Sequence, residues 1–267
     1  MSFQNVCVFV SSSDNTKDVF NHVCKSFDKY WSDCSYNCYV GTNNESGLVC
    51  NDKFVPITSV ESGWRSELLN QVINLPKNIE YVILFLDDFL ILSQVDDVRV
   101  NEIVEQSVAN NYDYVRLIPA SRTVWESGID EFKKVFNHNH KIGLISEKDP
   151  YYSSLQIALW KRAHLMTMLE LSGDIWEFEH HKKNGAKHYA VSDPLVDYKH
   201  IVEKGKWIPG FDKQLKKIGV IRDHGVRDSH TWIFYVRMHV GRLRFYIFGY
   251  SIMRIKRYIL GDMDIGI

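Results

Sequence analysis

Hydrophobic and polar residues along the first 120 positions follow a pattern that predicts alternating strands and helices. Apolar runs at Asn5–Val10 and Tyr36–Val40 have the length and the β-branched and aromatic content of buried strands. Between them, Thr16–Trp31 carries apolar residues at helical spacing. A strand, a helix and a second strand in this order are typical of a doubly wound α/β sheet.

The same pattern extends to residue 192. It predicts further strands at Phe54–Ile57, Tyr114–Ile118, Lys141–Ile145 and His188–Ser192. It predicts helices at 61–75, 98–110 and 153–171. Asp96 and Asp97 precede the second of these helices. Carboxylates at that position stabilise free backbone N–H groups, so we interpret both as capping residues.

The apolar stretch Ile79–Leu92, IEYVILFLDDFLIL, is interrupted by two adjacent aspartates, Asp87 and Asp88. Carboxylates are costly to bury inside a strand unless a cation pairs with them, so we expect the strand to end at the pair. In open α/β sheets, ligands bind at the carboxyl ends of the strands. A divalent metal or a ribose hydroxyl would explain the pair, and a plain strand-to-loop transition is the alternative.

The two aspartates are assigned to different parts of a ligand. Neighbouring side chains on an extended strand point in opposite directions, so both cannot chelate one ion if the strand continues through them. We assign Asp88 to the metal and Asp87 to the ribose or base of a nucleotide, and the reverse assignment stays open. Oxygen ligands of this kind select Mg²⁺ or Mn²⁺, which bind through one or two carboxylates plus substrate phosphates.

The composition is that of a folded protein with an uneven charge distribution. Of 267 residues, 45% are hydrophobic and 24% are charged, and the formal net charge is −1. Six basic residues and no acidic one lie between Trp232 and Leu260, which indicates a basic tail with an anionic partner and no nucleic-acid binding. Five cysteines without a secretory leader predict reduced, cytosolic thiols. Cys34 and Cys38 lack the further ligands of a zinc site.

The ordered motifs GWRSELL, VILFLDDFLIL, YVRLIP, SLQIALW and WEFE resemble those of bacterial surface-polysaccharide glycosyltransferases, which act on capsule, O-antigen and lipooligosaccharide. The resemblance covers about residues 6–207. It implies a GT-A-like, Rossmann-like α/β fold with a mixed, mostly parallel sheet flanked by helices. It also implies a nucleotide-sugar donor, with UDP-sugars favoured, and a divalent metal held at Asp87 and Asp88. The adjacent aspartates depart from the commoner spaced DxD motif of such enzymes.

The resemblance further implies a carboxylate that acts as general base on the acceptor hydroxyl in an inverting, single-displacement reaction, with retention as the alternative. We assign this role to Glu177 of WEFE, with Glu179 second; surface carboxylates that balance nearby charge are the structural alternative. The other predicted site residues are Ser11, Arg65 and Lys206 for the donor, Trp160, Trp176 and Gln156 for the acceptor, and His224 as a further metal ligand. Core packing is the alternative for the tryptophans, and an exposed ion pair for the arginine.

We expect a catalytic domain at 1–225 and a basic, aromatic helical segment at 226–267 that lies on an anionic membrane surface. A buried C-terminal helix or an oligomer contact is the alternative, and a homo-oligomer is also considered. No stretch reaches the ~20 apolar residues that cross a bilayer. The enzyme is therefore expected in the cytoplasm, peripheral on the inner face of the cell membrane, beside a lipid-linked or oligosaccharide acceptor.

Two other functions remain open beside a hexosyltransferase. A sugar-phosphate nucleotidyltransferase also uses carboxylate-held Mg²⁺ on a similar sheet, but it needs a Gly-rich basic loop that SSSDNTKD does not match. A non-catalytic membrane adaptor with a degenerate GT-A fold is the other candidate.

Overall fold

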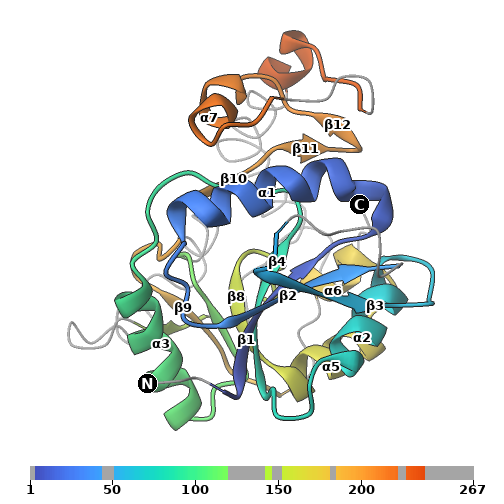
Figure 1. The fold of residues 1–267 in the computed structure, drawn as a ribbon. Helices are drawn as coiled ribbons and strands as arrows, with labels where there is room; N and C mark the ends of the chain where they lie inside the picture. The colour runs from blue at the N-terminus through green and yellow to red at the C-terminus, as the bar shows by residue number, and fades with distance from the viewer. Residues whose placement is uncertain are drawn as a thin grey trace, which may run out of the picture.

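An eight-stranded sheet with helices on both faces is the centre of the fold (Figure 1). The computed structural model describes residues 4–43, 51–119, 142–145, 152–180, 185–221 and 227–237. The strands lie in the order β3-β2-β1-β4-β8-β6-β9-β7. Their bounds are β1 Val6–Ser11, β2 Asn37–Thr42, β3 Phe54–Thr58, β4 Tyr81–Leu86, β6 Tyr114–Arg116, β7 Ile142–Leu144, β8 Ala158–Lys161 and β9 His188–Val191.

The sheet combines a parallel half with a mixed half. Strands β3, β2, β1 and β4 pair in parallel, whereas β8 is antiparallel to both β4 and β6, and β7 is antiparallel to β9. The order reverses at β1, because β2 and β3 extend the sheet on one side of it and β4 lies on the other. Ligands bind at such switch points, outside the carboxyl ends of the strands. The expected mixed, mostly parallel sheet flanked by helices is confirmed.

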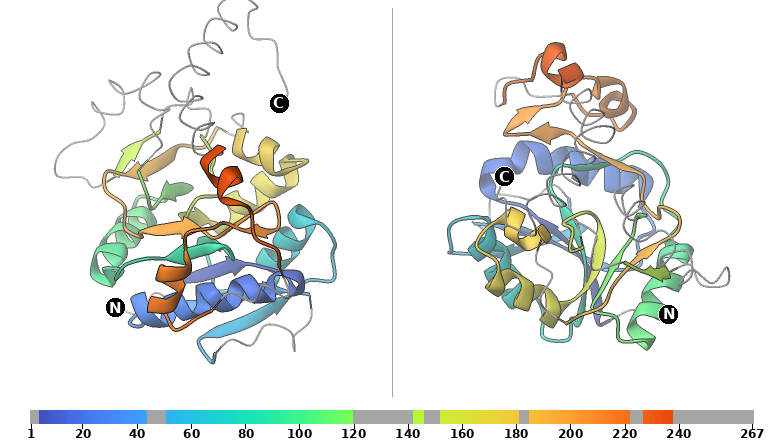
Figure 2. Two further views of the ribbon diagram at one scale, coloured as in Figure 1. Left: turned by 90° about the horizontal axis from the view of Figure 1, so that it is seen from above. Right: turned by 180° about the vertical axis from the view of Figure 1, so that it is seen from behind.

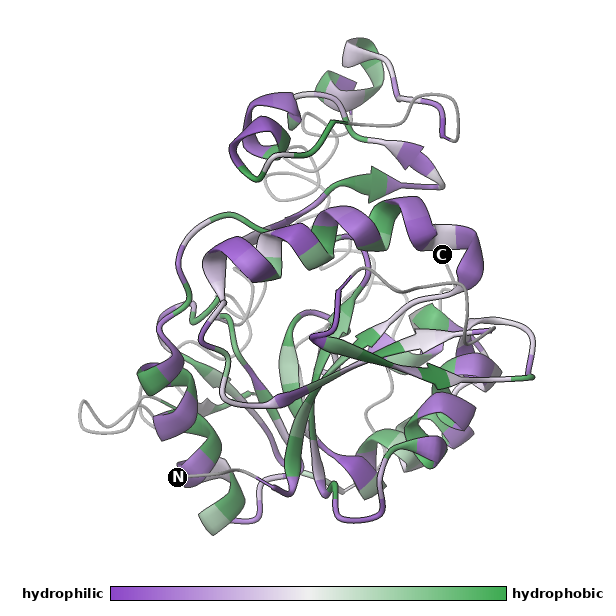
Figure 3. Cartoon of the chain, in the orientation of Figure 1, coloured by the Kyte–Doolittle hydropathy of each residue, from purple (hydrophilic) through white to green (hydrophobic). Residues whose placement is uncertain are grey.

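Helices cover both faces of this sheet. Their bounds are α1 Lys17–Tyr30, α2 Trp64–Asn74, α3 Asp97–Ala109, α5 Arg162–Leu171 and α6 Ile175–His180. On β1, Val6, Val8 and Val10 pack in the cluster formed with α1 and α3, and Cys7 and Phe9 pack in the cluster formed with α2, α5 and α6. Because both faces are covered, β1 and β4 are apolar along nearly all of their length (Figure 3).

The chain after β9 returns across α1. Strand β10 (Tyr198–His200) pairs antiparallel with β5 (Phe89–Ile91), and β11 (Val202–Glu203) forms a hairpin with β12 (Lys206–Trp207). The hairpin and α7 (Asp212–Lys217) lie along α1 in each view (Figure 2). An apolar cluster joins them: Val19, Leu90, Ile201, Trp207, Leu215 and Ile218. Within the described residues, no helix has the length and hydrophobicity needed to cross a membrane.

Most of the elements predicted from the sequence are confirmed to within a few residues, with one exception. The strand predicted from residue 79 ends at Leu86, directly before the aspartates, and Asp96 caps α3 by accepting a hydrogen bond from the N–H of Arg99 at 3.1 Å. The helix predicted at 153–171 is wrong in its first half, because residues 158–161 form β8. A strand buried on both faces has no polar alternation, so periodicity does not separate it from a buried helix.

The cysteines differ in state. Cys7, Cys34 and Cys38 carry free thiols, whereas Cys24 on α1 is disulfide-bonded. The expectation that all thiols are reduced is therefore wrong for Cys24. The sulfur atoms of Cys34 and Cys38 lie 4.0 Å apart, and the hydrogen bond from Cys38 lowers the pKa of Cys34.

A buried pair of histidines joins α5 to β9. The Nε2 atoms of His164 and His188 are 2.9 Å apart, and Nδ1 of His188 lies 3.0 Å from the carbonyl oxygen of Tyr152. Nδ1 of His188 therefore carries a proton, and when both rings are neutral its Nε2 accepts a hydrogen bond from Nε2 of His164. Burial lowers the pKa of His188 to about 3, which the hydrogen bond to Tyr152 opposes only in part. Burial also lowers the pKa of His164.

This pair makes the stability of the fold depend on pH. On unfolding, the pKa of His188 returns from about 3 to its ordinary value of 6.5, so the unfolded chain binds more protons between these values. The contribution of His188 to the free energy of unfolding is therefore expected to fall as the pH is lowered from 6.5 toward 3, by up to about 1.4 kcal/mol per pH unit. Asp87, whose pKa burial raises from 3.8 to about 7, contributes with the opposite sign between these two values.

Urea denaturation at a series of pH values measures this dependence. His188→Gln keeps one donor and one acceptor but does not titrate, so the variant should lose the His188 part of the pH dependence, and its loss of stability relative to the wild type should shrink as the pH falls from 6.5 toward 3. Equal slopes for the wild type and the variant would contradict the assignment of the dependence to this pair.

Candidate functional site

A cleft of about 380 Å³ lies at the carboxyl edge of the sheet, at the switch point between β1 and β4. The end of β1 and the turn after it line one side, and the segment before β8 lines the opposite wall, because β1 and β8 lie on either side of β4 in the sheet. The residues after β4 lie between them, and α2 and α6 also contribute lining residues. Five of the residues predicted from the sequence line it: Ser11, Asp87, Asp88, Gln156 and Glu179.

Asp87 is held from the β1 side of the cleft. The hydroxyl of Ser12 donates to its Oδ2 at 2.8 Å, and the hydroxyl of Thr16 lies 3.2 Å from that of Ser12. The N–H of Asp87 donates to the carbonyl of Ser11 at 3.2 Å. Burial raises the pKa of Asp87 to about 7, while the hydrogen bonds from Thr16 and Ser12 oppose this shift. A cation or a hydrogen-bond donor on a ligand would therefore favour the ionised carboxylate.

Asp88 is held from the other side, by a strand late in the chain. Its Oδ2 lies 3.0 Å from Nδ1 of His200 on β10, and its carbonyl oxygen accepts from the N–H of Ile201 at 3.0 Å. The His200 ring packs edge-on against Phe89, with centroids 4.7 Å apart. The two neighbouring carboxylates thus have separate partners, on β10 for Asp88 and after β1 for Asp87.

Glu179 reaches the cleft from the opposite wall. Its Oε1 accepts from the N–H of Leu155 at 3.2 Å and from the hydroxyl of Ser154 at 3.4 Å. Both bonds go to the same oxygen, so the carboxylate is fixed in place through one atom. Its second oxygen makes no hydrogen bond to the described part of the chain.

Glu177, the first choice for the base, does not line the cleft. Its carboxylate accepts from the N–H of Gly173, and its own N–H donates to Oδ1 of Asp174 at 2.8 Å. This reciprocal pattern closes the first turn of α6, as in a capping box. With 3.6 residues per turn, two residues that are two positions apart lie on nearly opposite sides of a helix. The structure therefore places Glu179 in the cleft and Glu177 in solvent.

Trp160 has no surface for an acceptor sugar, and its predicted stacking role is corrected. It lies on β8 with 0% of its surface exposed, and its ring packs against Tyr114 with centroids 4.4 Å apart and against Phe178 at 5.5 Å. The physical reason is its position on a central strand, where side chains of both faces are covered by helices. Trp176 lies on α6, and its side chain falls outside the described part.

Two of the predicted donor-binding cations also lie away from the cleft. Arg65, in the first turn of α2, donates to the carbonyl of Ser172 at 3.2 Å and so ties α2 to the end of α5. Lys206 is exposed on the β11–β12 hairpin, 3.7 Å from a carboxylate oxygen of Asp228. His224, the predicted further metal ligand, lies outside the described residues.

The cleft contains residues that the sequence did not single out. Trp64 at the start of α2 lines it, with its ring edge-on to Phe178 at 5.8 Å. Gln71 on the same helix donates to the carbonyl of Ser12 at 3.4 Å. The apolar face of GWRSELL carries a signal for Trp64, because residues four apart share a helix face. No local signal could reveal His200, since it is 112 positions from Asp88.

The cleft is acidic. Four carboxylates line it, those of Glu67, Asp87, Asp88 and Glu179, and no lysine or arginine does so among the described residues. The described residues also contain no cluster of three or more metal-ligating side chains. The oxygen donors fit a hard cation such as Mg²⁺ or Mn²⁺ that takes one or two carboxylates and fills its other positions with water and phosphate oxygens.

No family model and no curated protein matches the chain. Among solved structures, it is similar to S. aureus TarS 1-349, with 9% identity and a TM-score of 0.46 over 73% of this chain and 59% of that one. UDP-glucose pyrophosphorylase complexed with UDP-glucose has 10% identity and a TM-score of 0.46 over 74% and 92%. The galactosyltransferase LgtC, in complex with donor and acceptor sugar analogs, has 11% identity and a TM-score of 0.36 over 65% and 64%. Identities of 9–11% do not establish a shared function.

Proposed function

We propose that the chain is a glycosyltransferase that moves one sugar from a nucleotide-sugar donor, a UDP-sugar being favoured, to a hydroxyl of a glycan acceptor. The observation that carries the proposal is the arrangement of carboxylates in the cleft. Asp87 and Asp88 follow β4 at the switch point of the sheet, and Glu179 lines the same cleft from α6, beside the segment before β8. One wall suits a nucleotide diphosphate with its metal, and the other suits deprotonation of an acceptor.

The donor would occupy the β1 side. Asp88 would hold a divalent cation, Mg²⁺ or Mn²⁺, which when bound neutralises the charge that develops on the departing diphosphate. An acidic cleft repels a diphosphate unless such a cation is present, which supports a metal-dependent reaction. Asp87, which accepts a hydrogen bond from the hydroxyl of Ser12, would accept another from a ribose hydroxyl.

The acceptor would occupy the α6 side, with Glu179 as the base in place of Glu177. Glu179 takes the proton of the acceptor hydroxyl, and that oxygen attacks the anomeric carbon of the donor sugar. The bond from the anomeric carbon to the diphosphate oxygen breaks, and its electron pair leaves with the nucleoside diphosphate. Attack from the face opposite the leaving group inverts the anomeric centre. Trp64 offers the aromatic ring for sugar packing that Trp160 cannot provide.

A membrane-bound acceptor agrees with the chain after residue 231. Trp232, Ile233 and Val236 lie in a helical turn at residues 232–237 and are 62%, 66% and 55% exposed. Basic residues without acidic ones follow in the sequence to Leu260. Exposed apolar residues beside basic ones are typical of segments that lie in the membrane interface. We therefore propose a peripheral enzyme on the cytoplasmic face of the membrane that extends a lipid-linked surface glycan.

Binding of UDP to the purified protein is expected to require Mn²⁺ or Mg²⁺. Asp88→Asn should weaken UDP binding in the presence of Mn²⁺ at least about tenfold, because a metal ligand is lost. Isothermal titration calorimetry with UDP, GDP and CMP, each with and without Mn²⁺, measures this. Asp193→Asn, which breaks a surface ion pair with Arg99, is the matched control. Metal-independent binding, or equal binding by Asp88→Asn, would refute the role of Asp88.

Glu179→Gln is expected to lower kcat by about 100- to 10,000-fold and to leave the Kd for UDP unchanged, because the base acts on the acceptor. Glu177→Gln should keep most of the activity. Turnover of UDP-sugars with a glycan acceptor measures both variants, with circular dichroism as the check on folding. The reverse ranking would return the base to Glu177. Pyrophosphate release from a sugar phosphate and a nucleoside triphosphate would instead show a nucleotidyltransferase.

Full-length protein is expected to bind vesicles of phosphatidylcholine and phosphatidylglycerol better than vesicles of phosphatidylcholine alone, since each basic residue near an anionic surface contributes about 1 kcal/mol. Changing Trp232, Ile233 and Val236 together to serine should weaken binding about tenfold. Val60→Ser, which removes an apolar residue that is 93% exposed elsewhere, is the control. Co-sedimentation measures binding, and an unchanged triple variant would refute the role of this turn.

A further inference from the structure

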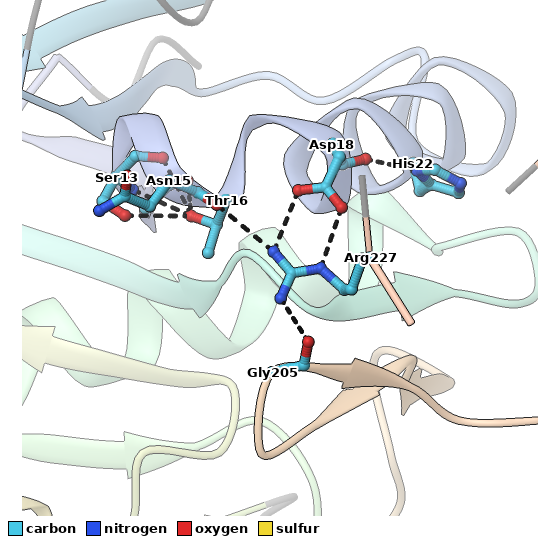
Figure 4. Close-up of polar contacts among 8 residues, drawn as sticks. Ser13, Asn15, Thr16, Asp18, His22, Gly205 and Arg227 are labelled. Carbon is cyan, nitrogen blue, oxygen red and sulfur yellow. Dashed lines mark hydrogen bonds and ion pairs between the residues drawn. The ribbon is translucent and has the colours of Figure 1, made fainter. Parts of the chain in front are cut away.

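Arg227 joins three segments that are far apart in the sequence (Figure 4). Its Nε and Nη2 atoms donate to the two carboxylate oxygens of Asp18 at 2.9 and 3.1 Å. Nη1 donates to the carbonyl of Gly205 at 2.7 Å, and Nη2 is 3.4 Å from the carbonyl oxygen of Asn15. The guanidinium therefore links the start of α1, the turn of the β11–β12 hairpin and the chain at residue 227.

The ion pair is shielded from solvent. The side chains of Arg227 and Asp18 are only 13% and 9% exposed, and the guanidinium lies 5.8 Å from the centroid of the buried Trp207 ring. Exposed ion pairs contribute little, but removing one partner of a shielded, bidentate pair leaves a charge without compensation. Breaking the Arg227–Asp18 ion pair is thus costly. The contacts of Arg227 fix the backbone at the start of α1, at Gly205 and at residue 227 itself.

One of those ends is the turn that forms the donor side of the cleft. Asn15 lies in the short 3₁₀ helix η1 (Asp14–Thr16), between Ser13 and Thr16, which both line the cleft. The hydroxyl of Thr16 is the centre of this turn, because it accepts from the N–H of Ser13 at 3.2 Å and lies 3.2 Å from the hydroxyl of Ser12. Ser12 in turn donates to Asp87. Arg227 is therefore linked to Asp87 in three steps: its contact with the carbonyl oxygen of Asn15, the backbone from Asn15 to Thr16, and the hydroxyl contacts from Thr16 through Ser12 to Asp87.

We propose that Arg227 is a positioning residue that fixes the Ser13–Thr16 turn. It thereby couples the segment from Tyr198 to Arg227, called the C-terminal segment below, to nucleotide binding at the cleft. This inference rests on the proposed function for its ligand, a nucleoside diphosphate with a divalent cation. Arg227 acts here through the turn and not as a phosphate ligand, since its nitrogens are taken by Asp18, Gly205 and Asn15. The packing of β11, β12 and α7 on α1 therefore affects the cleft, because this packing holds Arg227 against the Ser13–Thr16 turn.

A double-mutant cycle tests the coupling, with UDP and Mn²⁺ as the probe. Arg227→Gln and Asp18→Asn are each expected to weaken UDP binding about tenfold. The double variant should bind UDP as well as either single variant, because both single variants and the double variant lose the same Arg227–Asp18 contact. Arg99→Gln, which breaks the surface pair with Asp193, should bind like the wild type. If Arg227 were instead a direct phosphate ligand, Asp18→Asn would free it and binding would tighten, which would overturn the proposal.

Hydrogen exchange gives a second readout that needs no ligand. In Arg227→Gln, backbone amides at residues 14–18 should exchange about tenfold faster or more, while those of α3 keep their protection. Arg227→Lys keeps the charge and is expected to fold, but a single ammonium cannot reach Asp18 and both carbonyls, so residues 14–18 should still lose protection. Unchanged exchange in this turn would refute the positioning role. If wild-type protein binds no nucleotide while the turn loosens as expected, the proposed function fails and the positioning of the turn stands.

Discussion

The cost of burying charge decides where the central strand of this fold ends. β4 is covered by helices on both faces, and its side chains from Tyr81 to Phe85 are buried. A carboxylate within such a strand would lose its hydration without gaining a partner. The strand therefore stops at Leu86, and Asp87 and Asp88 emerge at the edge of the sheet. There, a serine hydroxyl and a histidine ring replace part of the lost water, and a polar cleft forms beside an apolar core.

The two halves of the sheet supply different chemistry to that cleft. The parallel half ends in hydroxyls and carboxylates, which suit a nucleotide and its cation. The mixed half brings Glu179, whose position depends on the segment before β8. That segment carries the N–H of Leu155 and the hydroxyl of Ser154, and it is held in turn by Tyr152, which stacks on His188 with centroids 4.3 Å apart. A neutral, buried histidine pair thus contributes to the geometry of the proposed base.

The C-terminal segment packs on α1 and also contributes to the cleft. The apolar cluster around Trp207 fastens it to α1, and the pairing of β10 with β5 brings His200 to Asp88. Arg227 adds an ion pair at the start of α1. Residues that follow all eight strands of the main sheet therefore supply one contact at the cleft, from His200 to Asp88, and one beside it, from Arg227 to the turn after β1. Such contacts explain why the segment crosses back over α1 and does not extend away from the sheet.

The amino-acid sequence by itself determined the α/β alternation, the end of β4 directly before Asp87 and the cap of α3 at Asp96, because each follows from local hydrophobic spacing or from the chemistry of neighbouring residues. It also indicated a ligand site at the carboxyl edge. Tertiary structure alone decided that residues 158–161 form a strand, since an apolar run buried on both faces looks the same in a helix. It also placed Glu179, and not Glu177, in the cleft, because two glutamates in one short motif differ only in which side of α6 meets the cleft. Contacts such as His200 with Asp88 join residues 112 positions apart, and no local pattern encodes which distant segment will complete a site.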